Sequence, residues 1–381
     1  MGGSWADVAA SWPAGVFILL AGLCVGSFLN VCIHRLPAGK SLFWPPSHCT
    51  SCQARIAWYD NLPVVSYVVL GGRCRRCGAR FSIRYPLVEA ATGLLFLGYW
   101  VAYFRLGVRA GADHAGVLVV HLALVGAMLV SGVIDLERKE IYTSVTTFAT
   151  AVGLAGSFLW PAVQRIAAYD RALPDLTGWA RSDALVMALV GAAVGAALVH
   201  LTRVLATQAF KKEAMGLGDA HLMGAVGAVL GWEGAVLAFF VAPFLALPYG
   251  LYQVFRPGGG SDQEKGEKGP GAEGEEKLRR PPVPWLALGL MVAGLALLAD
   301  AGLMARGRWS LGSRLALAAG LAGLALAFWL AGRQERRLAE AHEEPARAPP
   351  SHEVPYGPFL GAAAAIVMLG KDVAMRYFGF R

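Results

Sequence analysis

Apolar residues form long stretches throughout this chain, and most of these stretches have the length of a bilayer crossing. A transmembrane helix needs about 20 mostly apolar residues. The predicted spans are 14–33, 86–104, 114–134, 143–160, 183–206, two within 219–255, 285–304, 311–331 and 357–374. We therefore predict an all-α polytopic membrane protein with about ten transmembrane helices.

The stretch 219–255 is too long for a single helix across a bilayer. It contains the polar break Gly231-Trp232-Glu233-Gly234. We predict a short helix, 219–231, that barely crosses, followed by a full-length one.

Glycines spaced four apart recur in three of the predicted spans. Such spacing lets helix backbones approach closely, although Gly-rich and Ala-rich membrane proteins also show it by chance. The pairs are Gly22/Gly26, Gly191/Gly195 and Gly227/Gly231.

Composition and charge agree with this class. The chain is 56% hydrophobic and 16% charged, whereas soluble domains carry about 25% charged residues. Low charge with high hydrophobicity excludes general disorder, and six cysteines in 381 residues are too few for a disulfide scaffold.

The loops rich in Lys and Arg predict the orientation. The first 33 residues contain neither, and about two thirds of these residues fall in loops on one side, which marks the cytoplasm. These loops are 34–85, 135–142, 203–218, 256–284 and 332–356. The N-terminus is predicted to be periplasmic, and the first span is predicted to be a retained anchor because it lacks a basic n-region.

The chain divides into seven predicted units. Residues 257–281 are low-complexity Gly, Glu and Lys, which is typical of a flexible linker. The units are an N-terminal anchor helix (1–33), a cytoplasmic loop domain (34–85), a membrane core (86–255), a linker (256–284), an inserted transmembrane hairpin (285–331), a second cytoplasmic linker (332–356) and a C-terminal helix (357–381).

The loop 34–85 contains two CxxC pairs, Cys49/Cys52 and Cys74/Cys77. Two such pairs at this separation are the ligand pattern of a structural zinc site, and a loop this small gains stability from a metal. Two disulfides, redox-active pairs and free buried thiols are the alternatives. A reducing cytoplasm disfavours disulfides, so we predict a small zinc-binding cytoplasmic loop domain. Cys24 and Cys32 are predicted to be packing residues in the first span.

The same loop is rich in arginine. A zinc ribbon with basic residues could bind nucleic acid, but positive charge beside a membrane follows from orientation alone. We predict no nucleic-acid partner for this loop. The arginines are Arg73, Arg75, Arg76, Arg80 and Arg84.

Two aspartates stand at predicted span ends on the cytoplasmic side, where charged residues are costly and tend to be functional. Asp135 closes the third span and Asp219 opens the sixth. Two carboxylates brought together can share a proton and act as acid and base. The alternative is that each is an ordinary interface residue, with Asp219 a helix cap. The acidic residues expected to be merely solvated are Glu137, Glu140 and Glu213.

In these motifs, read in order, the sequence resembles the type IV prepilin peptidases. The matching segments are GSFLNVCIHRLP (26–37), the two CxxC pairs, IAWYDNLPVVSY (56–67), CRRCGARFSIRYPLVE (74–89), IDLERKEI around Asp135, GLGD ending at Asp219 and VPYGPFLGAAAA (354–365). This likeness runs over nearly the whole chain.

The resemblance implies a membrane aspartic endopeptidase of the bacterial inner membrane, with Asp135 and Asp219 as the catalytic pair. Such enzymes remove the basic leader of prepilins and pseudopilins after a glycine. They then N-methylate the new N-terminal residue with S-adenosylmethionine, and the four cysteines bind zinc. Prepilin substrates, the lipid bilayer and proteins of pilus or type II secretion assemblies are the implied partners.

The sequence departs from the family pattern in three places. Residues 141–143 are Ile-Tyr-Thr in place of Ile-Pro-Asp, and His221 replaces a lysine. The segment 257–331 inserts a linker and an even number of spans, so the later PYGPFL motif returns to the aspartate side. The residues themselves indicate no S-adenosylmethionine site, because a loop of about 50 residues is too short for a Rossmann domain.

Two other functions fit parts of the pattern. A proton-coupled transporter would use intramembrane aspartates, but it would predict repeated halves and leaves the cysteines unexplained. A non-enzymatic zinc scaffold would have no need of either aspartate.

Overall fold

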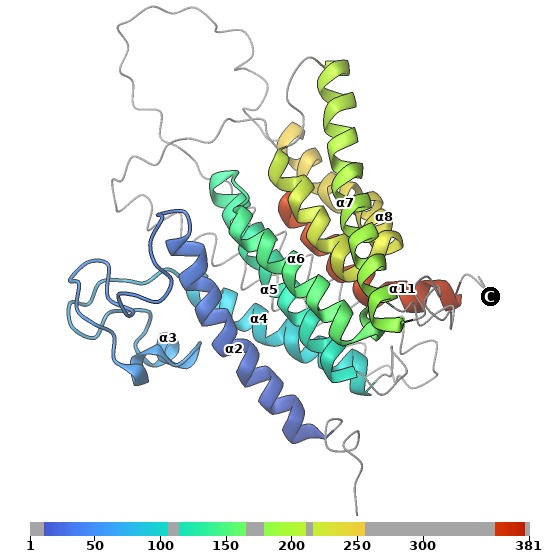
Figure 1. Ribbon diagram of the computed structural model, residues 1–381. Coiled ribbons are helices and arrows are strands. Elements are labelled where there is room, and N and C mark those ends of the chain that lie inside the picture. Colours follow the sequence, from blue (N-terminus) through green and yellow to red (C-terminus); the bar gives the residue numbers. More distant parts are fainter. Residues whose placement is uncertain (1–10, 106–113, 165–178, 211–215, 256–354, 378–381) are drawn as a thin grey trace, which may run out of the picture.

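The computed structural model describes residues 11–105, 114–164, 179–210, 216–255 and 355–377, and this part of the chain is helical (Figure 1). The elements are α2 (Trp12–Arg35), η1 (Trp58–Asn61), α3 (Val65–Val69), α4 (Arg84–Trp100), the π-helical η2 (Val101–Arg105), α5 (His114–Arg138), α6 (Thr143–Leu159), η3 (Pro161–Val163), α7 (Ala180–Phe210), α8 (Leu217–Phe255) and α11 (Gly357–Tyr377).

The predicted spans within the described residues all coincide with helices. Five helical segments are long and apolar enough to cross a membrane: Trp12–Arg35, Arg84–Arg105, Ala115–Arg138, Ala180–Gln208 and Leu217–Tyr249. Two shorter apolar helices are Thr143–Leu159 and Gly357–Gly370. The predicted hairpin 285–331 and both linkers lie outside the described residues, apart from the final two residues of the second linker, so the total of ten spans stays a prediction.

Glycine contacts set the distance between neighbouring helices. A Cβ atom on Gly26 of α2 would lie 2.7 Å from the Cα atom of Glu89 in α4, and one on Gly191 of α7 would lie 2.2 Å from the carbonyl oxygen of Gly227 in α8. Real Cβ atoms do not approach other atoms so closely, so only glycine allows these backbone contacts. The close-packing interpretation of the spaced glycines is confirmed at these positions.

Helix α8 reverses direction within its length. Gly231 has φ 71° and ψ 177°, which is not helical. A Cβ atom on Gly195 of α7 would lie 2.3 Å from the carbonyl oxygen of Met223 and 3.5 Å from the Cβ atom of Ala235. In a continuous helix two residues so far apart in sequence would be separated by about 18 Å along the axis, so the chain turns back at Gly231. The predicted division of this stretch is confirmed.

Helix α11 packs into the membrane core although a long segment separates it from α8 in sequence. The Tyr99 hydroxyl of α4 donates to the carbonyl oxygen of Ala365 at 3.1 Å. A Cβ atom on Gly132 of α5 would lie 3.3 Å from the Cα atom of Pro358. Helix α11 therefore lies against α5 and α8, and its first residue, Gly357, contacts Asp135 near the end of α5.

Most of the largest fully buried side chains among the described residues belong to α4, α5, α8 and α11. They include Tyr99, Trp100, Leu124, Ile134, Leu222 and Leu360. Of the two span cysteines predicted to pack, Cys32 is buried as expected. Cys24 is exposed, so the prediction is wrong for that residue, which lies on the outer face of α2.

Candidate functional site

Asp135 and Asp219 are both buried at helix ends, with 7% and 8% of their surfaces exposed. Asp135 lies one turn before the end of α5, and Asp219 lies in the first turn of α8. A carboxylate removed from water is costly unless polar groups hold it, so the groups around each aspartate decide what it can do.

The Asp135 carboxylate is held by the start of α11. The backbone N–H of Gly357 donates to Asp135 Oδ2 at 3.0 Å, across 222 positions of sequence. Gly357 is the first residue of α11, so the carboxylate occupies the positive end of that helix dipole. A Cβ atom on Gly357 would lie only 2.9 Å from Asp135 Oδ2. The glycine of the PYGPFL motif therefore makes this contact possible.

The Asp219 carboxylate has the same kind of partner. The backbone N–H of Gly216 donates to Asp219 Oδ2 at 3.2 Å, which is the contact of a side chain in the first helical turn reaching back to the cap position. Asp219 is the third residue of α8 and not its N-cap, so the N-cap alternative is wrong, although its side chain satisfies the N–H of the cap residue Gly216. This contact also fixes the orientation of the carboxylate, so it is compatible with a chemical role.

One contact places the start of α8 beside the end of α5. A Cβ atom on Gly218, in the first turn of α8, would lie 2.7 Å from the Cβ atom of Ile141, so this turn rests on the segment that follows α5. Burial raises the pKa of the Tyr356 hydroxyl to about 12, and the charge of Asp219 adds to that shift. Tyr356 precedes Gly357, the partner of Asp135, so residues 356–357 connect the surroundings of both carboxylates.

This arrangement suits acid–base chemistry. Carboxylates that share an environment titrate as a pair, so that one can be protonated while the other is ionised. An ionised partner can take a proton from water, and a protonated partner can donate one to a carbonyl oxygen.

The acidic residues near Asp135 are exposed and also have polar partners. Exposed Glu137 forms an ion pair with Arg84 at the start of α4, and exposed Glu140 accepts a hydrogen bond from the Tyr142 hydroxyl at 2.7 Å. The prediction that both are solvated is confirmed. Glu213 lies outside the described residues.

The two positions that depart from the family pattern are also placed. Tyr142 occupies the cap position of α6 without a side-chain cap, so the helix begins directly at Thr143. His221 is exposed on α8, two residues after Asp219.

The four loop cysteines converge on one point. The Sγ atoms of Cys49, Cys52, Cys74 and Cys77 all lie within 4.8 Å of one another, and those of Cys49 and Cys77 are 3.8 Å apart. Four thiolates around a tetrahedral zinc ion with Zn–S bonds of about 2.3 Å are about 3.8 Å apart. The cluster therefore has the size of a four-cysteine zinc site.

The two CxxC pairs form matching knuckles. His48 pairs with Arg55 around the first, and Arg73 pairs with Arg80 around the second. In each knuckle the first cysteine's N–H donates to a later alanine carbonyl, at 2.9 Å to Ala54 and at 2.8 Å to Ala79. The duplicated geometry explains why the two pairs present their sulfur atoms alike.

The two cysteines of the second knuckle differ in pKa. The N–H groups of Cys77 and then Arg76 lower the pKa of the Cys74 thiol to about 7. The Ala79 amide lowers the pKa of Cys77, but burial and the neighbouring cysteines outweigh it and raise that pKa to about 11. Thiolates bind metal, so Cys74 is the cysteine of this pair poised to lose its proton first.

One side chain ties the loop that carries the four cysteines to a helix, and two more join the helices next to it. Glu89 of α4 accepts the N–H of Val64 at 2.7 Å, and Asn30 of α2 donates to the Tyr85 carbonyl at 2.9 Å. Arg84 adds its ion pair with Glu137. The metal loop and the aspartates therefore lie at the same end of the bundle.

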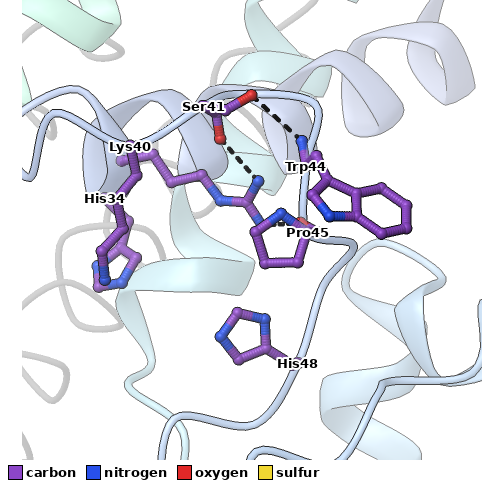
Figure 2. Close-up of a pocket in the computed structure, with 7 residues that line it drawn as sticks. His34, Lys40, Ser41, Trp44, Pro45 and His48 are labelled. Atoms are coloured by element: carbon purple, nitrogen blue, oxygen red, sulfur yellow. Dashed lines mark hydrogen bonds between the residues drawn. The ribbon is translucent and has the colours of Figure 1, made fainter.

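Arg35 folds the chain where α2 ends. Its guanidinium donates to the carbonyl oxygens of Ser41 at 2.9 Å and of Pro45 at 2.6 Å. Figure 2 shows the cavity that this turn encloses, of about 270 Å³. It is lined by His34, Arg35, Lys40, Ser41, Trp44, Pro45 and His48.

Three residues of the site and its surroundings could not be predicted from the sequence. Arg35, Glu89 and Gly357 each take part in a contact between a side chain and a backbone group of another segment, which no local pattern reveals. All three lie in segments that resemble the family (26–37, 74–89 and 354–365), which offered a signal without giving the residues a role.

Two family models match the chain. Residues 20–103 match the bacterial peptidase A24 N-terminal domain, and residues 122–251 match the type IV leader peptidase family. The first match contains the four cysteines, and the second contains both aspartates.

Curated relatives give the same picture. The chain is 35% identical over 243 residues to the prepilin leader peptidase/N-methyltransferase of Myxococcus xanthus (strain DK1622), covering 64% of this chain and 64% of that protein, or just under two thirds of its length. It is 35% identical over 241 residues to the protein of the same name from Klebsiella pneumoniae, covering 60% of this chain and 90% of that protein. A Pectobacterium carotovorum subsp. carotovorum relative, also of that name, is 34% identical, with 60% and 79% covered. No solved structure matches the chain.

Proposed function

The chain belongs to the type IV leader peptidase family, and from this premise we propose that it is a prepilin leader peptidase and N-methyltransferase. Its substrates are prepilins or pseudopilins, whose leader it removes after a glycine. Family membership favours this function over a proton-coupled transporter. No feature of the described residues specifically supports a transporter.

Asp135 and Asp219 are the proposed catalytic pair. The observation that carries this proposal is that each buried carboxylate accepts a glycine N–H at a helix N-terminus. Both also lie near residues 356–357. Preorganised donors of this kind hold reacting groups in place without reorganisation during the reaction.

The proposed reaction is hydrolysis of one peptide bond. The ionised aspartate takes a proton from water, whose oxygen attacks the carbonyl carbon of the leader's last glycine. The protonated aspartate donates to the carbonyl oxygen. As the C–N bond breaks, the aspartate that took the proton from water gives it to the new amine, and a hydroxyl of the tetrahedral intermediate returns a proton to the other aspartate. The products are the leader acid and the mature N-terminus.

Cys49, Cys52, Cys74 and Cys77 are proposed to hold a structural zinc ion. The support is the convergence of four sulfur atoms within the size of a tetrahedral thiolate site. When bound, zinc would supply folding energy to a loop too small for a core of its own.

The proposed methyl donor is S-adenosylmethionine, which transfers its methyl group to the amine that cleavage exposes. The names of the relatives support this methyl transfer, and we assign no residue to it.

We place the protein in the bacterial inner membrane, with a periplasmic N-terminus and the aspartates facing the cytoplasm. The support is the five apolar helices and the concentration of basic residues in the loops at the aspartate end. In this orientation the basic leader reaches the aspartates while the apolar segment of the substrate stays in lipid. Proteins of a pilus or type II secretion assembly are the expected partners.

Incubation of the purified protein in nanodiscs with a synthetic prepilin tests this function. Mass spectrometry is expected to show cleavage after the glycine and, with S-adenosylmethionine present, the mass of one added methyl group on the mature fragment. An intact substrate in the presence of monodisperse, folded protein would overturn the peptidase assignment.

A further inference from the structure

Large apolar side chains are exposed on the metal loop, where a soluble loop would bury them. They belong to η1, α3 and the turn between these elements, and we refer to them together as the α3 patch. Its members are Trp58 (79% exposed), Tyr59 (52%), Leu62 (45%), Val65 (56%), Val68 (71%) and Val69 (73%).

Polar contacts join the two elements that carry the α3 patch. The buried Ser66 hydroxyl donates to the Tyr59 carbonyl at 3.0 Å and accepts the Leu62 N–H at 2.9 Å, so it joins η1 to α3. Arg75 stacks over the Tyr59 ring at 5.8 Å and forms an ion pair with Asp60. The apolar side chains therefore project from a structured scaffold.

The depth of the patch follows from its attachment to α4. The N–H of Val64, which precedes α3, donates to Glu89 Oε2 at 2.7 Å. Glu89 lies five residues beyond Arg84, the first residue of the apolar helical segment Arg84–Arg105, which is about 7.5 Å along the helix axis. Helix α3 thus lies beside the end of a membrane span rather than beyond it, and Figure 1 shows it to the side of the bundle near α2.

We propose that the α3 patch is embedded in the headgroup region of the bilayer, in the leaflet at the aspartate end. Interfacial elements bury an apolar face about 5–10 Å into the boundary of headgroups and acyl chains, and the end of a membrane span lies at this boundary. Trp and Tyr are the residues enriched at that level.

Charge complementarity favours a lipid occupant over a protein. Exposed arginines in the same loop suit anionic phospholipid headgroups. They are Arg73, Arg76 and Arg80. Membrane contact would hold the metal loop at the end of the bundle where the aspartates lie.

Photo-crosslinking in nanodiscs of anionic and zwitterionic phospholipid tests the proposal. The photoreactive amino acid p-benzoylphenylalanine replaces Val68 and, in a second variant, Val69, so that one poorly folding variant does not end the test. Phe17, exposed on the membrane helix α2 (69%), is the positive control. Gln53, exposed on the first cysteine knuckle, is the negative control.

Intact-protein mass spectrometry is expected to show phospholipid adducts at Val68 and Val69 comparable to those at Phe17, and several-fold above those at Gln53. Adduct yields equal to the Gln53 control would overturn the proposal. A crosslink between two copies of the chain, or to added prepilin, in place of lipid adducts would overturn it as well. The readout does not use peptidase activity, so it is independent of the proposed function.

Discussion

Single backbone positions decide the geometry around the two aspartates. Gly357 presents its N–H to Asp135 because it has no side chain to keep the carboxylate away.

In the loop between α2 and α4, Gly78 and Gln53 occupy equivalent positions of the two cysteine knuckles, with φ of 71° and 57°. Gly78 is relaxed because glycine readily adopts a positive φ, whereas the same conformation at Gln53 costs about 1–2 kcal/mol. The fold accepts that strain in one knuckle and avoids it in the other.

Replacement of Gly357 tests the contact with Asp135. In Gly357→Ala a Cβ atom would lie 2.9 Å from Asp135 Oδ2, so the carboxylate must move. Small displacements of reacting groups cost up to about 100-fold in rate, and we expect prepilin cleavage to slow by about 10- to 100-fold with little change in melting temperature.

Gly98→Ala is the matched control, because a Cβ atom on Gly98 meets nothing within 4 Å. Cleavage by the Gly98 variant should equal that of wild type. A cleavage rate of Gly357→Ala equal to that of wild type would show that the N–H of Gly357 does not position Asp135.

At the scale of elements, the structure depends on close helix pairs and on a loop that is tied down at both ends. Helices α7 and α8 touch through glycine backbones, and α8 turns back at Gly231. The loop between α2 and α4 is organised by four cysteines and anchored to α4 through Glu89. Each of these features makes a separate prediction about stability or composition.

The α7–α8 contact predicts a strong size effect at Gly227. A Cβ atom there would lie 2.0 Å from the carbonyl oxygen of Gly191, and backbone cannot yield as a flexible side chain can. Overpacking typically costs about 1–3 kcal/mol, so Gly227→Leu should lower the melting temperature in detergent clearly.

Gly224→Ala on the same helix provides the comparison, since a Cβ atom there makes an ordinary contact of 3.5 Å with the Ala192 carbonyl oxygen. A thermal scan in which both variants melt together with wild type would refute the close backbone contact.

The cysteine cluster predicts about one zinc ion per chain. Elemental analysis of protein purified without chelators should find it, and combined Cys49→Ser and Cys74→Ser substitutions should abolish it. Limited proteolysis should then cut between residues 36 and 83, because the loop loses its metal clip. Cys24→Ser leaves the cluster intact and serves as control; wild-type protein free of zinc would contradict the prediction.

At the scale of the whole molecule, most of the described architecture could be predicted from the lengths of the apolar stretches and from the spacing of the cysteines. Apolar stretches located the described helices, and the break at Gly231 and the cysteine convergence followed from local sequence, because these depend on neighbouring residues. The contact of Gly357 with Asp135 and that of Glu89 with Val64 could not be foreseen. They join a side chain to a distant backbone group, and only the folded chain decides which N–H is near.

The central claim is that Asp135 and Asp219 act together as the catalytic pair of a leader peptidase. The most direct measurement is the single-turnover cleavage rate of a prepilin by Asp135→Asn, Asp219→Asn and the double variant, each first shown to be folded by its melting profile. Because residues that act as a unit are non-additive, each single variant should lose about three orders of magnitude or more, and the double variant should lose little beyond that. A single variant that cleaves at the wild-type rate would contradict the account.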